Sequence, residues 1–172
     1  IAGDDPMLLS QMDPDKVSRA NKAMAKAYKP ARERITEFKI NWNIVSWPGS
    51  AWASRVFPEL PLDEAIVKLA DAIFDASRAS VDDPIQAWDD HNEKLRIKTN
   101  WLNEKNFAAL QYNGPNTNLR VGLADEHEWM GGASKAQNGI ICNPNIPSEE
   151  VFTTPHAYKV DGTVSSTKPL SY

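Results

Sequence analysis

The prevailing spacing of apolar residues changes near Asn106, and the change limits the folds that this chain can adopt. Up to that residue, apolar side chains recur every three or four positions, as they do on one face of a helix. Beyond it, short apolar runs alternate with turn residues such as Asn113-Gly114-Pro115-Asn116, a pattern typical of hairpins. We therefore expect an α/β plus α+β chain, with a helix-rich α/β domain in residues 1–106 and a β-rich domain beginning in residues 107–172.

Aspartate followed by proline marks where two of the expected helices begin. Asp13-Pro14 and Asp83-Pro84 each place an N-cap acid before a proline at the first helical position, where the missing N–H does no harm. The first helix should end or kink at Lys29-Pro30, because a proline in a helix interior has no N–H to donate. The second has the form of a capping box with Gln86 and should run to about Lys105.

Two further helices are expected between these. A short helix opens at Ala51-Trp52-Ala53 and ends near Phe57-Pro58, and a longer helix covers residues 62–76. Three of the four helices carry an apolar stripe that should face a core. In chain order, the stripe residues are Val17, Ala20, Met24 and Ala27, then Ile66, Leu69, Ile73 and Phe74, and then Ile85, Trp88, Leu95 and Leu102.

The strand predictions begin with residues 39–47, which have apolar side chains on both faces. A strand covered on both sides is typical of a parallel sheet, so we expect one here. Residues 107–112 and 119–123 are predicted to form a hairpin, because turn residues separate two short apolar runs. Residues 160–165 form a further strand candidate.

Composition excludes several classes of protein. The chain is 41% hydrophobic and 24% charged, as in globular proteins, and its net charge of −4 has no long single-sign run. A nucleic-acid-binding face would be basic, and a membrane span needs about 20 apolar residues, so we expect neither partner. The start, Ile1 to Asp5, does not resemble a signal peptide. The lone Cys142 excludes an internal disulfide framework, fits a reducing compartment, and is interpreted as a small core residue.

Two adjacent carboxylates, Glu149 and Glu150, lie between Pro147 and Pro155. The prolines make this connection stiff, and an extended backbone sends neighbouring side chains to opposite faces, so the two glutamates should diverge. We expect the following Val151-Phe152 pair to be buried, and a carboxylate held beside it then needs a metal ion, an arginine or a lysine as partner. The alternative is a solvated pair of glutamates in a loop.

The surrounding motifs resemble a known family. The sequence NIPSEEVFTTP at residues 145–155 is followed by KVDGTV at 159–164 and STKPLSY at 166–172. The shorter motifs upstream are WNIV (42–45), AWA (51–53), VFP (56–58), DP (83–84), AW (87–88), HN (91–92) and LNEKNF (102–107). In this order, they resemble the thermophilic metallo-aminopeptidase family, which includes the aminopeptidase S, aminopeptidase T and PepS types.

The resemblance implies a domain organisation. Family members are much longer than this chain, so it should be an internal fragment. It should hold the end of an N-terminal parallel-sheet α/β domain and the start of a β-rich metal-binding domain, which agrees with the change of pattern near Asn106.

The resemblance also implies a metal site. The family uses two divalent metal ions, for which Zn, Co and Mn are all suited, held by Glu, His, Tyr and Asp side chains. Its first ligand is the glutamate directly before Val-Phe-Thr, which is Glu150 here. Glu149 matches the neighbouring position, where it would support the ligand or accept a proton. The remaining ligands should lie beyond the segment that matches Tyr172, outside this chain.

The three histidines offer other interpretations. His91 follows Asp89 by two positions, and such residues do not share a helical face, so we expect a surface or hydrogen-bonded helix residue instead of a ligand. His127 lies in a charged stretch that should be solvated. His156 lies six residues past Glu150 and near Asp161, so a local Glu150–His156 metal site is an alternative. The sequence contains no nucleophile elbow, phosphate-binding loop or dinucleotide fingerprint, and Gly131-Gly132 is too short a signal to interpret.

Two functions remain in view. The resemblance implies a cytoplasmic, homodimeric metal-dependent aminopeptidase that acts on peptides with a free N-terminus, and the fragment alone should be inactive. The alternative is a non-catalytic Trp-rich α/β interaction or binding module, because six tryptophans could contact a partner or a sugar.

Overall fold

The computed structural model describes residue 5 and residues 7–168, and its contacts group into two compact units. The first unit comprises Ile1–His91 and Gly132–Ser148, and the second comprises Asn92–Gly131 and Glu149–Tyr172. The chain therefore passes between the units three times. The predicted domain boundary near residue 106 stays a prediction.

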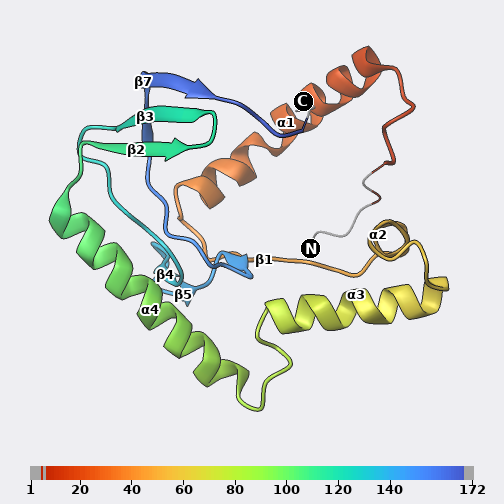
Figure 1. Cartoon of the computed structure of the whole chain (residues 1–172). Helices are drawn as coiled ribbons and strands as arrows, with labels where there is room; N and C mark the ends of the chain where they lie inside the picture. Colours follow the sequence, from red (N-terminus) through yellow and green to blue (C-terminus); the bar gives the residue numbers. More distant parts are fainter. Residues whose placement is uncertain (1–4, 6, 169–172) are drawn as a thin grey trace. The chain divides into compact units, whose positions relative to one another are not determined.

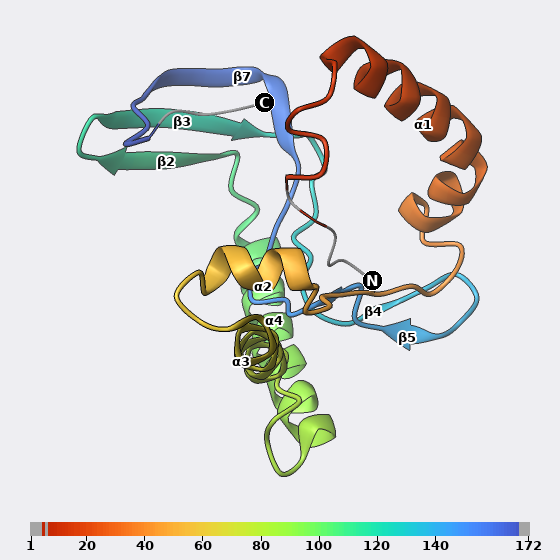
Figure 2. The ribbon, with the colours of Figure 1, turned by 90° about the vertical axis from the view of Figure 1, so that its right-hand side faces the viewer.

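The core of the first unit forms between two helices, α2 (Ser50–Val56) and α3 (Leu62–Ala76), which lie beside each other in Figure 2. Both helices occupy the predicted ranges. Ala53 of α2 is buried against Ala65 and Leu69 of α3. Small alanines at the contact let the two backbones approach closely. The half-buried residues around this centre are Trp52, Phe57, Leu60, Ile66 and Ile73.

In the second and third predicted stripes, one residue each is exposed. Phe74 of α3 is 51% exposed, because it lies nine residues after Ala65 and hence about 180° around the helix axis from it. Ile85 is 77% exposed and lies in the first turn of α4 (Pro84–Lys105), about 80° around the axis from buried Leu95. The buried stripes are therefore narrower than the sequence pattern indicates.

Helix α1 (Pro14–Thr36) begins as predicted but does not end at Pro30. The Asp13 side chain accepts a hydrogen bond from Asp15 N at 2.9 Å, so the cap is formed. Pro30 lies inside the helix, which continues for six more residues, so of the two predicted alternatives, an end or a kink, the end is wrong. None of the described residues of α1 is buried, so its predicted apolar stripe faces no core within the described part of the chain.

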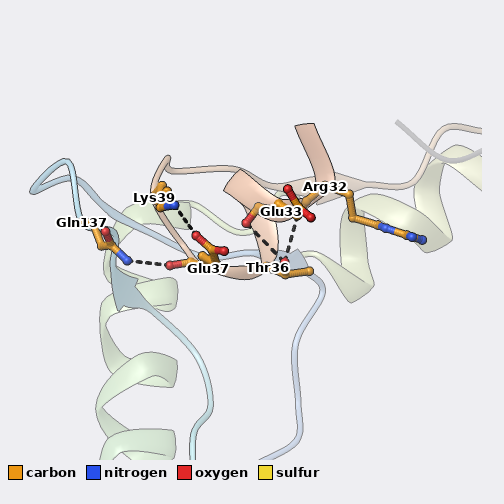
Figure 3. Close-up of polar contacts among 6 residues, drawn as sticks. All are labelled: Arg32, Glu33, Thr36, Glu37, Lys39 and Gln137. Atoms are coloured by element: carbon orange, nitrogen blue, oxygen red, sulfur yellow. Dashed lines mark hydrogen bonds and ion pairs between the residues drawn. The ribbon is translucent and has the colours of Figure 1, made fainter. Parts of the chain in front are cut away.

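The carboxyl end of α1 is closed by local polar contacts, shown in Figure 3. Thr36 Oγ1 donates to the carbonyl oxygens of Arg32 (3.0 Å) and Glu33 (3.3 Å), and Glu37 N also donates to Glu33 O at 2.9 Å. Lys39 forms an ion pair with Glu37. The side chain of Gln137 donates to Glu37 O at 2.8 Å and ties the end of the helix to a distant loop of the same unit.

The strands of the first unit are short. Strand β1 (Ile44–Val45) pairs in parallel with β6 (Asn145–Ile146), and β4 (Ser134–Lys135) pairs antiparallel with β5 (Ile141–Cys142). The predicted parallel pairing is present, but the predicted strand over residues 39–47 shrinks to two residues. The reason is that β6 offers only a two-residue partner. Cys142 is half-buried and forms no disulfide.

The second unit contains most of α4 and a three-stranded antiparallel sheet in the order β2-β3-β7, visible in Figure 1. Strands β2 (Ala109–Gly114) and β3 (Thr117–Leu123) form the predicted hairpin. Strand β7 (Pro155–Val164) begins five residues before the predicted start. Leu123 of β3 is buried, and its partner in the register is Pro155.

Only one of the two hydrogen bonds of the predicted capping box forms at the start of α4. The Asp83 side chain accepts from Gln86 N at 3.0 Å, as an N-cap should. The Gln86 side chain does not return to the cap, however, and donates to Asp90 Oδ1 at 2.8 Å. Within the described part of the chain, no helix has the length and apolar character to cross a membrane. The fold class is confirmed as mixed α/β, with a parallel pair and antiparallel sheets.

Candidate metal-ligand site

Glu149 and Glu150 lie in the connection between β6 and β7, and both are exposed. One oxygen of the Glu150 carboxylate, Oε2, accepts a hydrogen bond from Glu149 N at 3.1 Å. The following residues are not buried as assumed, because Val151 is half-buried and Phe152 is 53% exposed. Burial therefore does not force a partner on Glu150. Its carboxylate is instead accessible to a ligand from outside.

The backbone beyond Glu150 is paired with the segment that precedes Gly131. Met130 and Phe152 exchange two backbone hydrogen bonds, of 2.9 Å from Met130 N and 2.8 Å from Phe152 N. Thr153 Oγ1 donates to Glu128 O at 2.7 Å, and Ala124 N donates to Thr154 O at 3.0 Å. These contacts lie within the second unit and hold residues 152–154 in place.

Gly131 lies where the backbone of Glu150 passes. A Cβ atom at position 131 would lie 2.9 Å from Glu150 O and 3.0 Å from Val151 Cγ1, closer than side chains normally approach. Glycine is required there by this close approach. The sequence interpretation missed Gly131, because a Gly-Gly pair alone does not show which backbone it will meet.

Asn103 of α4 also holds the segment before Gly131. Its Oδ1 accepts from Trp129 N at 2.7 Å, and its Nδ2 donates to Trp129 O at 3.1 Å. The side chain thus satisfies both backbone groups of a residue that is only 8% exposed. Asn103 occurs in the LNEKNF motif, but nothing in the sequence indicates that it contacts residue 129.

His91 is a hydrogen-bonded helix residue, as predicted. Its Nε2 lies 2.6 Å from Ser148 O, and its Nδ1 lies 3.2 Å from a guanidinium nitrogen of Arg78. The ring also packs edge-on against Trp88, with centroids 5.6 Å apart. Ser148 is buried and belongs to the chain just before Glu149. These contacts lie within the first unit.

The other two histidines are held by the backbone. The charged stretch around His127 is exposed at Asp125, Glu126 and Glu128, as expected, and only the histidine is half-buried. Its Nδ1 donates to Ala124 O at 3.0 Å, and its ring packs against Trp129, which accounts for the burial. His156 Nδ1 accepts from Tyr158 N at 3.2 Å. Neither set of contacts includes Glu150.

The sheet carries one charge pair near these residues. Lys159 Nζ of β7 donates to Asp125 Oδ1 at 3.0 Å. This hydrogen bond, together with the charge of Lys159, holds the pKa of Asp125 below its usual range. Residues 169–172 of the STKPLSY motif lie outside the described residues.

The described residues fit one metal ligand and no complete site. Residue 5 and residues 7–168 contain no group of three or more His, Cys, Asp or Glu side chains that could hold a metal ion. The alternative Glu150–His156 site therefore lacks a third ligand in this part of the chain. The hard, exposed carboxylate of Glu150 suits a divalent cation as a single donor.

The comparison with known families identifies the chain. It belongs to the family described as thermophilic metalloprotease (M29), which matches residues 1–172. The resemblance inferred from its motifs is confirmed.

The relatives are aminopeptidases. Aminopeptidase T of Thermus thermophilus is 51% identical over 171 residues, or 99% of this chain, and aminopeptidase 2 of Geobacillus stearothermophilus is 45% identical over 172 residues. The solved structure of wild-type AmpT from Thermus thermophilus matches 98% of this chain with a TM-score of 0.87 and 49% identity. The chain spans 42% of the length of both relatives and 41% of that structure.

Proposed function

We propose that this chain is part of a metal-dependent aminopeptidase in which Glu150 supplies one carboxylate ligand. The family match along the whole chain carries the proposal, because the relatives that share it are aminopeptidases. The structure supports the choice of Glu150. Its carboxylate is exposed, while the backbone on its carboxyl side is held by Gly131 and by the pairing of Met130 with Phe152.

The proposed centre holds two divalent ions, of Zn, Co or Mn, and takes its other ligands from outside this chain. A catalytic Zn site usually has about three protein ligands, so Glu150 alone cannot form one. When bound, the metal would lower the pKa of a water molecule and polarise the carbonyl of the substrate. Glu149 offers its backbone N–H to the Glu150 carboxylate. It thereby supports the ligand, without itself being proposed as one.

The remaining parts of the proposal concern the whole protein. Its substrates are peptides with a free N-terminus, it acts in the cytoplasm as a homodimer, and the present chain alone is inactive.

The alternative of a Trp-rich binding module is less well supported, because three of the six tryptophans are buried or engaged in internal contacts. Trp52 packs on the core of the first unit, Trp88 Nε1 donates to Ser77 O at 2.9 Å, and Trp129 is buried. Trp47 and Trp101 are 62% and 51% exposed and belong to different units.

Substitution of Glu150 by glutamine in the whole protein tests the proposal. Glutamine keeps the shape of the side chain and removes its charge, so metal affinity should fall by at least about tenfold. Hydrolysis of leucine p-nitroanilide should fall with it. The bound metal is measured by elemental analysis after dialysis, and the activity is measured at saturating metal.

Glu149→Gln serves as the matched control, because it leaves the backbone N–H of residue 149 in place. It should retain the metal and most of the activity. If Glu150→Gln binds metal and cleaves the substrate as the unchanged protein does, Glu150 is not a ligand and the proposed site is wrong.

A further inference from the structure

The second unit contains a hollow of about 390 Å³. Its walls come from the segment between α4 and β2, from β3 and the turn that follows it, and from β7. All the residues that line it belong to the second unit, and neither Glu149 nor Glu150 is among them. Ligand pockets range from about 300 to 1,000 Å³, so a hollow of this size suits a small molecule.

Gly122 of β3 forms part of the wall without filling the space. A Cβ atom at Gly122 would lie 2.5 Å from Lys159 Cβ and 2.7 Å from Lys159 O, so no side chain fits at this position. Lys159 also lines the hollow, and its Nζ lies 3.0 Å from Asp125 Oδ1. These two charges offset each other, so the remaining charges of the wall decide which ligand fits.

Two opposite charges of the wall, on Arg120 and Glu126, remain without a partner. Within residue 5 and residues 7–168, neither side chain forms an ion pair or a hydrogen bond, and the two do not pair with each other. Asp161 lies opposite Arg120 in the register of β3 and β7, yet it forms no ion pair with it. The hollow thus offers one cation and one anion to a ligand.

The turn that carries Glu126 is fixed at both ends. Ala124 N donates to Thr154 O at 3.0 Å, and His127 donates to Ala124 O from its backbone N (3.2 Å) and from Nδ1 (3.0 Å). Glu126 itself has φ 58°, which residues other than glycine rarely adopt and which persists only where the surroundings impose it. The carboxylate therefore extends from a backbone of defined conformation.

Phe107 and Leu123 give the hollow an apolar side. Leu123 is buried. The ring of Phe107 packs edge-on against Trp101, with centroids 6.0 Å apart, and remains 38% exposed. An apolar group of a ligand can therefore contact a ring that already has a fixed neighbour.

We propose that this hollow binds a small zwitterion with an apolar side chain, such as leucine. The carboxylate of the ligand pairs with Arg120, whose planar fork of N–H donors matches a carboxylate. The ammonium group pairs with Glu126, and the apolar side chain contacts Phe107. A multiply charged anion such as phosphate fits less well, because the carboxylates of Asp125 and Glu126 repel it.

The site itself does not depend on Glu150. If the whole protein is an aminopeptidase, its product or a short substrate has this chemistry, and only that link rests on the proposed function. A free amino acid and a dipeptide are both zwitterions and differ in the distance between their charges. Comparison of leucine with leucylleucine distinguishes them, because the one that binds more tightly identifies the source.

The affinity of the metal-free whole protein for leucine, measured by ligand-detected NMR, tests the proposal. Absence of the metal excludes binding of leucine to a metal ion. Arg120→Gln and Glu126→Gln should each weaken the binding of leucine by about tenfold, the effect of losing one hydrogen bond to a charged group. Glycine, which has no apolar side chain, should bind more weakly than leucine.

Two analogues of leucine assign each charge to its partner. Leucinamide lacks the carboxylate, so Arg120→Gln should not weaken its binding. N-Acetylleucine lacks the ammonium group, so Glu126→Gln should not weaken its binding. A variant that has lost its fold would instead lose all the ligands together, and in that case the other variant decides.

Glu128→Gln is the matched control, because Glu128 is exposed, lies two residues from Glu126 and does not line the hollow. It should bind leucine as the unchanged protein does. The proposal is overturned if leucine does not bind the metal-free protein, or if Arg120→Gln and Glu126→Gln both leave its affinity unchanged.

Glu150→Gln keeps this proposal apart from the proposed metal site. It should lower metal affinity and leave the binding of leucine to the metal-free protein unchanged. Loss of leucine binding in Glu150→Gln would place the ligand at Glu150 and contradict the assignment to the hollow. Unchanged metal affinity in the same variant would contradict only the metal ligand.

Discussion

Gly131 shows how a single residue can decide whether the candidate ligand is correctly placed. The backbone carbonyl of Glu150 and the side chain of Val151 occupy the space that any side chain at position 131 would need. The neighbouring Met130 is locked to Phe152 by two backbone hydrogen bonds, so the segment cannot simply swing away. A methyl group at position 131 must therefore displace the backbone of the residue whose carboxylate we propose as a ligand.

Gly131→Ala in the whole protein should lower the free energy of unfolding by about 1–3 kcal/mol, the usual cost of adding a methyl group to a filled space. Metal affinity should fall as well, because the backbone at Glu150 moves. Denaturant unfolding of the metal-free protein and chelator competition measure the two effects.

Gly114→Ala is the matched control for this substitution. A Cβ at Gly114 would meet only Thr117 Cβ, at 4.0 Å, which is ordinary contact. Its effect on stability should stay within about 1 kcal/mol, with unchanged metal affinity. Equal losses of stability and of metal affinity in Gly131→Ala and Gly114→Ala would show that the close approach at Gly131 affects neither quantity.

At the scale of elements, the pairing of β3 with β7 depends on a glycine near the carboxyl end of β7. Gly162 has φ 128° and lies opposite Leu119, and a Cβ there would lie 2.1 Å from Asn118 O. Both the backbone conformation and the available space exclude a side chain. The strand reaches the full length of Pro155–Val164 only because this position is glycine.

Gly162→Ala should therefore destabilise the whole protein by about 3 kcal/mol or more, since it combines a disfavoured φ with a backbone clash. Gly139→Ala separates the two causes. Gly139 also has a positive φ, of 88°, but nothing lies within 4 Å of a Cβ built there. Gly139→Ala should lower the free energy of unfolding by about 1–2 kcal/mol, the cost of the disfavoured φ without a clash. Thermal and denaturant unfolding give both values, and a smaller loss for Gly162→Ala than for Gly139→Ala would contradict the argument.

At the scale of the whole molecule, the described residues do not bury most of their large apolar side chains. Tyr158 of β7 is 93% exposed, and Ile141 and Val67 are 69% and 60% exposed. The chain spans 42% of the length of its relatives, so a comparison of stability is meaningful only for the whole protein. The proposed metal centre is likewise a property of the whole protein, because Glu150 is only one of several ligands.

Metal removal should destabilise the whole protein, because a ligand that binds only the folded state adds to its stability. At a free metal concentration of about 100 times the dissociation constant, binding adds about 2.7 kcal/mol to the free energy of unfolding. Chelation should accordingly lower the melting temperature by several degrees, and added Zn²⁺ should restore it. In Glu150→Gln, the same treatment should produce a smaller shift. If chelator leaves the melting temperature of the unchanged protein as it was, no tightly bound metal stabilises the folded state.

Much of the local structure followed from residue order. The range of α3, the capped starts of α1 and α4, and the hairpin of β2 and β3 depend on caps, turn residues and apolar spacing, which act over a few neighbouring positions. The errors arose where a distant partner decides. Phe74 is exposed because α2 covers only the side of α3 that holds Ala65 and Leu69.

The candidate site divides in the same way. The motif around Glu150 is contiguous, so the ligand assignment and the family could be inferred from residue order. The supports of that ligand are far apart in the chain. Gly131 and Asn103 act on residues 19 and 26 positions away from them, through backbone groups that carry no side-chain signature.

The sequence by itself thus determined the family, the helices with their caps, the hairpin and the glutamate that we propose as a ligand, because each depends on neighbouring residues or on a contiguous motif. Only the tertiary structure decided which residues surround that glutamate and which apolar side chains are buried. The physical reason is that a backbone carbonyl or N–H is the same at every position, so its partner is set by where the chain folds back.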